Sequence, residues 1–236
     1  MSRRYASESL TVARWRDDRS STGPLRVLLI VDPTGDLPGA AAEGKALQDL
    51  LRARGTTFDV LEGGEATRAR VLTALATGSF DVLHFAGHAF FDAASPGNGG
   101  LLCAGKEVLR GVDLAGLGTL PALVFCNACE AARVRKRSGR TARPRPPSRL
   151  LGARRSMTGI AEAFLSGGVA NFMGTHWPVG DDAAFAFSRE LYGALLKGEA
   201  LGDAVLGARR RVAALPSLDW ADYVLYGNAE FRIVSM

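Results

Sequence analysis

The chain of 236 residues has few cysteines, few lysines and no long apolar run. Three cysteines are too few for a disulfide framework. No stretch of 18 apolar residues exists, which argues against a membrane span, and residues 1–23 lack the apolar core of a signal peptide. Hydrophobic residues make up 47% of the chain, which excludes a disordered protein. We therefore expect a cytoplasmic protein without membrane partners, with a polar tail at 1–23 and one domain at 24–236.

Acidic residues are missing from 133–155, although basic residues are frequent there. The ten basic residues are Arg133, Arg135, Lys136, Arg137, Arg140, Arg143, Arg145, Arg149, Arg154 and Arg155. Without these ten, 19 basic residues face 24 acidic ones, so the net charge of +5 becomes −5. The positive charge thus belongs to one basic loop at about 131–156, and the rest of the chain does not indicate a nucleic-acid-binding domain. Three prolines in this loop oppose a stable helix.

Short apolar runs alternate with segments of helical periodicity. Strands are predicted at 25–33, 57–63, 80–88, 121–128 and 169–177, and helices at 39–55, 66–78, 157–168, 181–196 and 199–214. A small hairpin with a short helix is expected at 99–117, and an edge strand near the C-terminus. This alternation is typical of an α/β fold, with a central, mostly parallel sheet flanked by helices.

Three reactive side chains follow predicted strands: His88, Cys129 and His176. In parallel α/β sheets, ligands bind beyond the carboxyl ends of the strands. If the three strands are neighbours, a thiol nucleophile and an imidazole base meet at one edge. Gly87 permits close backbone approach there, and the amides around His88 and Ala89 are suited to holding an oxyanion.

Other interpretations of these residues stay open. Cys129 is also compatible with a buried structural role, and with Cys126 it forms a CxxC pair, for which zinc would need two more ligands. His176 is a rival base, or lines a pocket together with Trp177. Core packing is the expected role of His84 and of Cys126.

Several segments together resemble the CHAT family of caspase-like cysteine peptidases, which are related to separases. They are VLHFAGHA, LVFCNACEAA, GIAEAFLSGGVANFMGTHWPVGDDAAFAFSRELYGALLKG and WADYVLYGN, and the resemblance extends over about 25–234. It implies a caspase-like three-layer sandwich. It also implies that Cys129 is the nucleophile and His88 the catalytic histidine, with the backbone amides of Cys129 and Ala89 holding the oxyanion. This chemistry requires no metal and no cofactor.

The resemblance also bears on specificity. In separase-like peptidases an acid shortly after a Trp-x-Val segment lies in the pocket for the residue before the cut. Asp181 matches that place, and Asp182 is adjacent. A carboxylate in such a pocket would pair with Arg or Lys of the substrate. Both acids equally suit the start of a helix, where they interact favourably with its dipole, and the two roles are compatible.

The basic loop occupies the place of the caspase linker whose cleavage activates the zymogen. A peptidase that cuts after Arg and carries an arginine-dense loop carries its own cut sites, and such loops are readily nicked. We therefore expect activation by cleavage of this loop, either by the protein itself or by an upstream activating peptidase. A solvated spacer and a nucleic-acid-binding arm are the alternatives, the second without further support in the chain.

The expected partners are protein substrates. Bacterial relatives act in defence and cell-death pathways, antiviral and CRISPR-associated ones included, which is the context that the resemblance implies. A caspase-like scaffold without turnover is the alternative from a different functional class. The presence of both His88 and Cys129 argues against it.

Overall fold

A central sheet organises the molecule. The computed structural model describes residues 2–3, 25–90, 99–114, 116–117, 120–128, 160–162, 164–165 and 168–233. The strand order is β1-β10-β9-β8-β4-β2-β3, with β1 (Ser2–Arg3), β10 (Tyr223–Tyr226), β9 (Asn171–Thr175), β8 (Leu123–Asn127), β4 (Val82–Ala86), β2 (Arg26–Val31) and β3 (Thr57–Glu62). The five strands from β9 to β3 are parallel, and β10 is antiparallel to β9. The expected mostly parallel sheet is confirmed.

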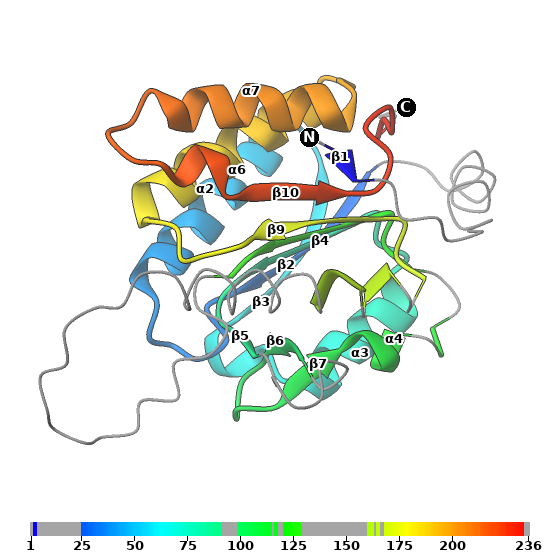
Figure 1. Cartoon of the computed structure of the whole chain (residues 1–236). Helices are drawn as coiled ribbons and strands as arrows, with labels where there is room; N and C mark the ends of the chain where they lie inside the picture. Colours follow the sequence, from blue (N-terminus) through cyan, green and yellow to red (C-terminus); the bar gives the residue numbers. More distant parts are fainter. Residues whose placement is uncertain are drawn as a thin grey trace, which may run out of the picture.

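Helices cover both faces of this sheet (Figure 1). On one face lie α2 (Pro38–Ala53), α6 (Asp181–Leu195) and α7 (Leu201–Ala213). The other face carries α3 (Arg68–Gly78), α4 (Gly111–Leu114) and a small antiparallel sheet of β5 (Ala89–Phe90), β6 (Gly100–Leu102) and β7 (Val108–Arg110). Two short 3-10 turns, η1 (Gly63–Glu65) and η3 (Asp219–Ala221), complete the described elements. The three-layer arrangement agrees with the α/β sandwich expected from the sequence.

The strand residues alternate between two hydrophobic cores, as the period of two in a strand requires. In β2, Val27 and Leu29 pack in the core beneath α2, α6 and α7, whereas Leu28 and Ile30 pack in the core beneath α3 and α4. All six residues of β2 except Arg26 are buried. The continuous apolar run in the sequence therefore reflects a strand covered on both faces.

The other predicted elements are present, with ends that differ by a few residues, whereas the helix predicted at 157–168 is described only at 160–162 and 164–165. The C-terminal strand β10 is one strand in from the edge, because Ser2 and Arg3 pair with Leu225 and Tyr226. The rest of the predicted tail and the whole basic loop lie outside the described residues.

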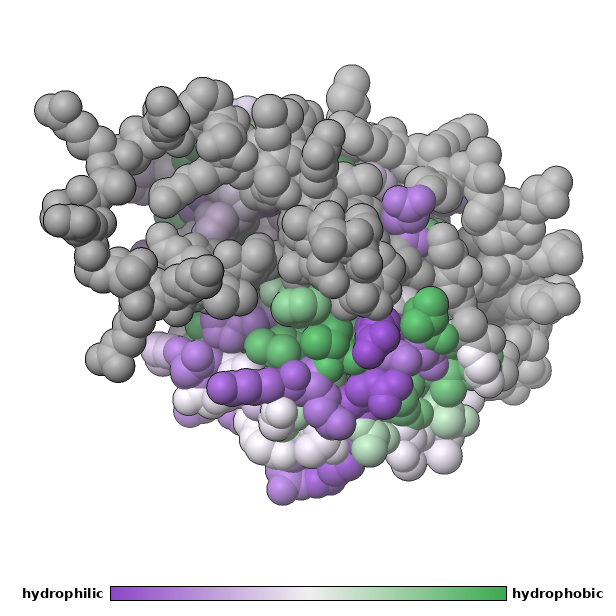
Figure 2. All heavy atoms as spheres, turned by 60° about the horizontal axis from the view of Figure 1, so that its bottom comes forward, coloured by the Kyte–Doolittle hydropathy of each residue, from purple (hydrophilic) through white to green (hydrophobic). Residues whose placement is uncertain are grey.

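Seen from the side of the molecule that carries α3 and the small sheet, the described surface has hydrophilic and hydrophobic side chains next to one another (Figure 2). Within the described part of the chain, no helix combines the length and the apolar character that crossing a membrane needs.

Candidate active site

The carboxyl ends of the parallel strands form one edge of the sheet, which we call the rim. There, Ala86 of β4 pairs with Asn127 of β8, and the Gly87 N–H donates to the Asn127 carbonyl at 3.3 Å. His88 follows Ala86 by two residues, and Cys129 follows Asn127 by two residues. Cys129 itself is outside the described residues. The contact between His88 and Cys129 therefore stays a prediction, while the register of the two strands that lead to them is established.

Gly87 makes a close approach possible at the end of β4. A Cβ added there would lie 2.9 Å from both the Phe85 ring and the Pro33 Cδ. The crowding on two sides, rather than an unusual dihedral, requires glycine at this position. It confirms the expectation of close backbone approach immediately before His88.

His88 has a carboxylate partner that the sequence did not suggest. Its Nε2 lies 3.2 Å from Oδ1 of Asp36, and its side chain is 27% exposed. Asp36 lies between β2 and α2, and β2 is the neighbour of β4. A carboxylate at one ring nitrogen fixes the orientation of an imidazole and stabilises its protonated form. The other ring nitrogen then remains for exchange with a nucleophile.

The loop that carries Asp36 is well defined. Oδ1 of Asp32 accepts the N–H groups of Asp36 and Leu37, both at 3.2 Å. Asp32 has a φ of 42°, in the left-handed region that aspartate tolerates better than most residues, and its own N–H donates to the Ala86 carbonyl at 2.8 Å. The loop is thus tied to the end of β4, just before His88.

Asp36 is held in its ionised form. The hydroxyl of Thr34 donates to its Oδ1, and this hydrogen bond, followed by the charge of His88, lowers the pKa of the Asp36 carboxyl below its usual value. An ionised carboxylate is the form that supports an imidazolium. The pair is accordingly arranged for proton exchange at the rim.

Ala89 begins the small sheet, where it pairs with Leu101 and is buried. The Leu102 N–H donates to the His88 carbonyl at 2.9 Å. The chain on both sides of the His88 ring is therefore held by hydrogen bonds. The predicted oxyanion role of the Ala89 and Cys129 amides stays a prediction.

His176 and Trp177 follow β9 on the opposite side of β8 from His88. Their N–H groups donate to Oδ1 of Asp222, at 2.6 and 2.9 Å. His176 is 9% exposed, far less open than His88. The two histidines thus follow the strands on either side of the strand that leads to Cys129, and His88 is the more accessible of the two.

The segment 176–180 is fastened by the DWAD sequence at 219–222, which sequence reasoning missed. Besides Asp222, Asp219 accepts the Gly180 N–H at 3.2 Å. Asp222 is fully buried, and burial raises the pKa of its carboxyl to about 8, against the lowering effect of the two hydrogen bonds from 176 and 177. The sequence signal that could have indicated this contact is the pair of acids Asp219 and Asp222, three residues apart and next to a predicted strand.

Asp181 and Asp182 are the first two residues of α6 and are exposed. The Asp181 carboxyl lies against the first turn of α2: a Cβ added to Gly39 would lie 2.2 Å from its Cγ. It therefore sits at the positive ends of two helices, which confirms the expected helix-start role. Because Gly39 follows Asp36 by three residues, the structure brings Asp181 to the same rim as His88. Its role in a substrate pocket stays a prediction.

The remaining residues singled out from the sequence are either buried or lie outside the described part of the chain. His84 and Cys126 are fully buried, as expected, and Cys103 is buried in the hairpin, where burial raises the pKa of its thiol to about 11. Among the residues that the structure describes, no three His, Cys, Asp or Glu side chains are placed to hold a metal ion. The ten basic residues of the loop are outside the described part of the chain.

Comparison with known proteins identifies relatives at the level of the fold. Gingipain R (RgpB) of Porphyromonas gingivalis, an Arg-specific cysteine proteinase, matches with a TM-score of 0.63 at 13% identity, over 98% of this chain and 54% of that chain. Saccharomyces cerevisiae separase, solved with securin, matches with a TM-score of 0.54 at 18% identity, over 91% of this chain and 13% of that one. The protein GSU0716 of Geobacter sulfurreducens gives 0.52 at 15% identity, over 89% and 98%.

This chain therefore spans about half the length of gingipain R and a much smaller share of separase. No curated protein matches it. The solved structures confirm the caspase-like fold. A family model described as CHAT domain matches residues 3–228. Because that match extends over nearly the whole sequence, the chain belongs to the CHAT domain family.

Proposed function

We propose that this protein is a cysteine endopeptidase that cleaves protein substrates after Arg or Lys. The observation that carries the proposal is the register of β4 and β8, because their paired last residues, Ala86 and Asn127, each come two residues before a candidate catalytic residue, His88 or Cys129. The ion pair of His88 with Asp36 supports it, because it supplies the group that orients the base.

In the proposed reaction the Cys129 thiolate attacks the carbonyl carbon of the scissile bond. Backbone amides near Cys129 and Ala89 hold the oxyanion. The His88 imidazolium gives its proton to the leaving amine, and the acyl-enzyme is then hydrolysed by a water molecule that His88 deprotonates. Asp36 keeps one ring nitrogen of His88 occupied throughout.

Selection of a basic residue is supported by the carboxylates at the rim. Asp36, Asp181 and Asp182 are acidic and exposed within one neighbourhood, since the Asp181 carboxyl touches the first turn of the helix that follows Asp36. An arginine side chain pairs well with such carboxylates. Gingipain R, which shares the fold, is an Arg-specific proteinase.

Activation by cleavage of the basic loop completes the proposal. Ten basic residues within 133–155 offer cut sites to a basic-specific peptidase, either this protein or an upstream one. We place this switch in a bacterial defence or cell-death cascade, the context of the family. A silent scaffold and a nucleic-acid-binding arm remain the alternative functions.

The decisive experiment is labelling with an arginyl chloromethylketone, before and after limited proteolysis. We expect the label on Cys129, and its loss in His88→Ala. If His176 were the base instead, the label would survive in His88→Ala and vanish in His176→Ala. A wild-type protein that stays unlabelled even after proteolysis would contradict the peptidase and favour the scaffold.

The loop has its own test. A Cys129→Ala protein that is still fragmented when purified alone would exclude self-cleavage. A variant whose ten basic residues are replaced by glutamine should remain intact and inactive. Full activity in that variant would contradict activation by cleavage. If the wild-type protein binds an oligonucleotide in a salt-dependent way and the glutamine variant does not, the loop is a nucleic-acid-binding arm.

A further inference from the structure

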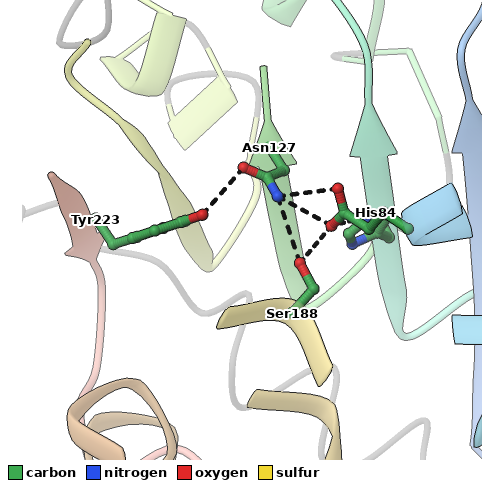
Figure 3. Close-up of polar contacts among 5 residues, drawn as sticks. His84, Asn127, Ser188 and Tyr223 are labelled. Atoms are coloured by element: carbon green, nitrogen blue, oxygen red, sulfur yellow. Dashed lines mark hydrogen bonds and ion pairs between the residues drawn. The ribbon is translucent and has the colours of Figure 1, made fainter. Parts of the chain in front are cut away.

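The last residue of β8 lies in a buried group of polar side chains that the proposed chemistry does not use (Figure 3). Asn127 Nδ2 donates to Oε1 and Oε2 of Glu43, at 2.9 and 3.0 Å. The Tyr223 hydroxyl donates to Asn127 Oδ1 at 3.3 Å, and the Ser188 hydroxyl donates to Glu43 Oε1. His84 Nε2 lies 3.3 Å from the same carboxylate oxygen, as an ion-pair contact. We call these five residues the buried polar cluster.

The cluster allows the Asn127 amide only one orientation. A carboxylate can only accept hydrogen bonds, so the NH₂ group must face Glu43. The Tyr223 hydroxyl donates to the opposite side of the amide, so the carbonyl oxygen must face Tyr223. Turning the amide over would set the oxygen of Asn127 against the carboxylate. The side chain, and with it the end of β8, is therefore fixed.

The backbone after β8 is held as well. The Asn127 carbonyl accepts the Gly87 N–H from β4, and the Ala128 carbonyl accepts the Thr175 hydroxyl from β9 at 3.4 Å. These are the two residues that precede Cys129 in the chain. The approach to the nucleophile is thus secured from beneath by the cluster and from both sides by neighbouring strands.

The other members of the cluster come from elements that also supply the rim. Glu43 is on α2, which follows Asp36; His84 is on β4, which precedes His88; Ser188 is on α6, which begins at Asp181; Tyr223 begins β10, directly after Asp222. One buried group therefore joins α2, β4, β8, α6 and β10, five of the elements that support the candidate site. The core around it is otherwise apolar, and burying a carboxylate in an apolar core is unfavourable unless it is fully bonded. Packing alone does not explain polar residues here.

We propose that the buried polar cluster sets the position of Cys129, and that Asn127 is the positioning residue through which it acts. The inference rests on the proposed function, in which Cys129 must reach His88. A thiol held next to an imidazolium reacts as a thiolate below the pH at which an ordinary thiol does. Loss of Asn127 should therefore move the reactivity of Cys129 toward that of an ordinary cysteine.

The chain offers matched controls for two kinds of change. Asn171 is also a buried asparagine, with hydrogen bonds to the Ala122 carbonyl and the Asn228 N–H, but it begins β9 at the opposite edge of the sheet. Tyr226 is on the same strand as Tyr223 but packs in the other core, and its hydroxyl has no hydrogen-bond partner within the described residues. The pairs to compare are Asn127→Ala with Asn171→Ala, and Tyr223→Phe with Tyr226→Phe.

The experiment measures iodoacetamide alkylation of Cys129 in the full chain against pH, by mass spectrometry, because this readout does not depend on turnover. Cys103 and Cys126 are buried, so they interfere little. In Asn127→Ala we expect alkylation at pH 6.5 to fall about tenfold and the profile to move toward higher pH. Asn171→Ala should lower the melting temperature without moving the profile. Tyr223→Phe should show a smaller shift, and Tyr226→Phe none.

Each outcome decides something. A folded Asn127→Ala protein with the wild-type profile overturns the inference. If that variant does not fold, Tyr223→Phe decides, and an unchanged profile there overturns it. An equal shift in Asn171→Ala also overturns it, because loss of stability alone would then explain the effect. If wild-type Cys129 reacts like an ordinary thiol and His88→Ala changes nothing, the proposed function itself has failed.

Discussion

Two histidines on one strand and its extension, His84 and His88, each lie beside a carboxylate, and their surroundings differ in nearly every other respect. His84 lies 3.3 Å from Glu43, with exposed fractions of 0% and 4% for the two side chains. His88 lies 3.2 Å from Asp36, with exposed fractions of 27% and 65%. Nearly equal distances thus occur in two environments only four residues apart.

Burial, more than pairing, determines whether a histidine–carboxylate pair contributes to stability or to proton exchange. Removing one partner of a buried pair leaves an uncompensated charge and is strongly destabilising. An exposed pair contributes little to stability, since solvent screens it. It can, however, exchange protons with water and with a neighbouring thiol. We therefore assign stability and positioning to the buried pair and chemistry to the pair at the rim.

The two histidines should respond in opposite ways to alanine substitution. In His88→Ala, kcat/KM for an arginyl peptide should fall about 10⁴-fold because the base is lost. Its unfolding free energy should change by less than about 0.5 kcal/mol, as for other surface positions. His84→Ala should lose about 3–5 kcal/mol of stability because a fully buried ring is removed and Glu43 loses its ion-pair contact, while the folded fraction is still labelled. Urea unfolding and active-site labelling of both variants measure these effects, and a stable, unlabelled His84→Ala protein would reverse our assignment.

Asp222 extends the comparison to a buried carboxylate that binds backbone N–H groups. Burial raises the pKa of Asp222 to about 8 in the folded protein, whereas an unfolded aspartate titrates near ~3.9. The folded state holds the proton more tightly, so the stabilisation is complete below about pH 4 and is lost as the pH rises to about 8. Asp222→Asn cannot lose that proton. Between these pH values its unfolding free energy should fall by roughly 5 kcal/mol less than that of the wild type, from about four pKa units at about 1.4 kcal/mol each.

Denaturant unfolding at several pH values checks this, with Asp219→Asn as the control. Asp219 lies on the same turn and also accepts a backbone N–H, but it is only partly buried. Parallel stability curves for the wild type and Asp222→Asn would show that burial of Asp222 has no consequence for pH dependence.

Substitution of the two carboxylates should show the same contrast as substitution of their histidine partners: loss of activity at the rim and loss of stability in the core. In Asp36→Asn, we expect kcat/KM to fall about 10–100-fold, because the imidazolium loses its charged partner, with little change in melting temperature. Glu43→Gln should lose about 1–3 kcal/mol, because a buried amide cannot accept all the bonds that the carboxylate accepts. Peptide turnover and thermal unfolding of both proteins separate the two effects. Equal destabilisation by the two substitutions would remove the distinction between rim and core.

The sequence allowed prediction of the features of this fold that depend on neighbouring residues, but not of contacts between segments that are far apart in the chain. Apolar runs and helical spacing are local, so the strands and helices were found within a few residues of their ends. His88 was found because a reactive side chain after Gly87 at a strand end is itself a local signal. Asp36 was missed because VDPTGD is explained as a turn by its own composition, and its partner is 52 residues away.

The same reason explains the buried polar cluster. Glu43 is one acid in an amphipathic helix, and nothing nearby indicates that Asn127, 84 residues later, is its partner. That contact depends on β4 and β8 being neighbours and on α2 crossing above them, which no single segment encodes. Asp222 was likewise close in sequence to a predicted strand, yet its partners at 176 and 177 come from another one. Motifs indicated the candidate nucleophile and base, and the topology supplied the carboxylate beside His88 and the polar partners of Asn127.

The two hydroxyls that donate to these carboxylates allow the finest comparison. Thr34 donates to Asp36, and this bond is the largest cause of the lowered Asp36 pKa. Thr34→Val should therefore raise that pKa, and the acid side of the pH profile of Cys129 alkylation should move toward higher pH. Ser188 donates to Glu43, and Ser188→Ala should cost about 1 kcal/mol of stability while that acid side stays in place. Alkylation between pH 3 and 6, with unfolding measured in parallel, checks both. If Ser188→Ala moved the acid side as far as Thr34→Val does, the buried pair would affect the reactivity of Cys129 as much as the pair at the rim, and the division between the two pairs would have to be given up.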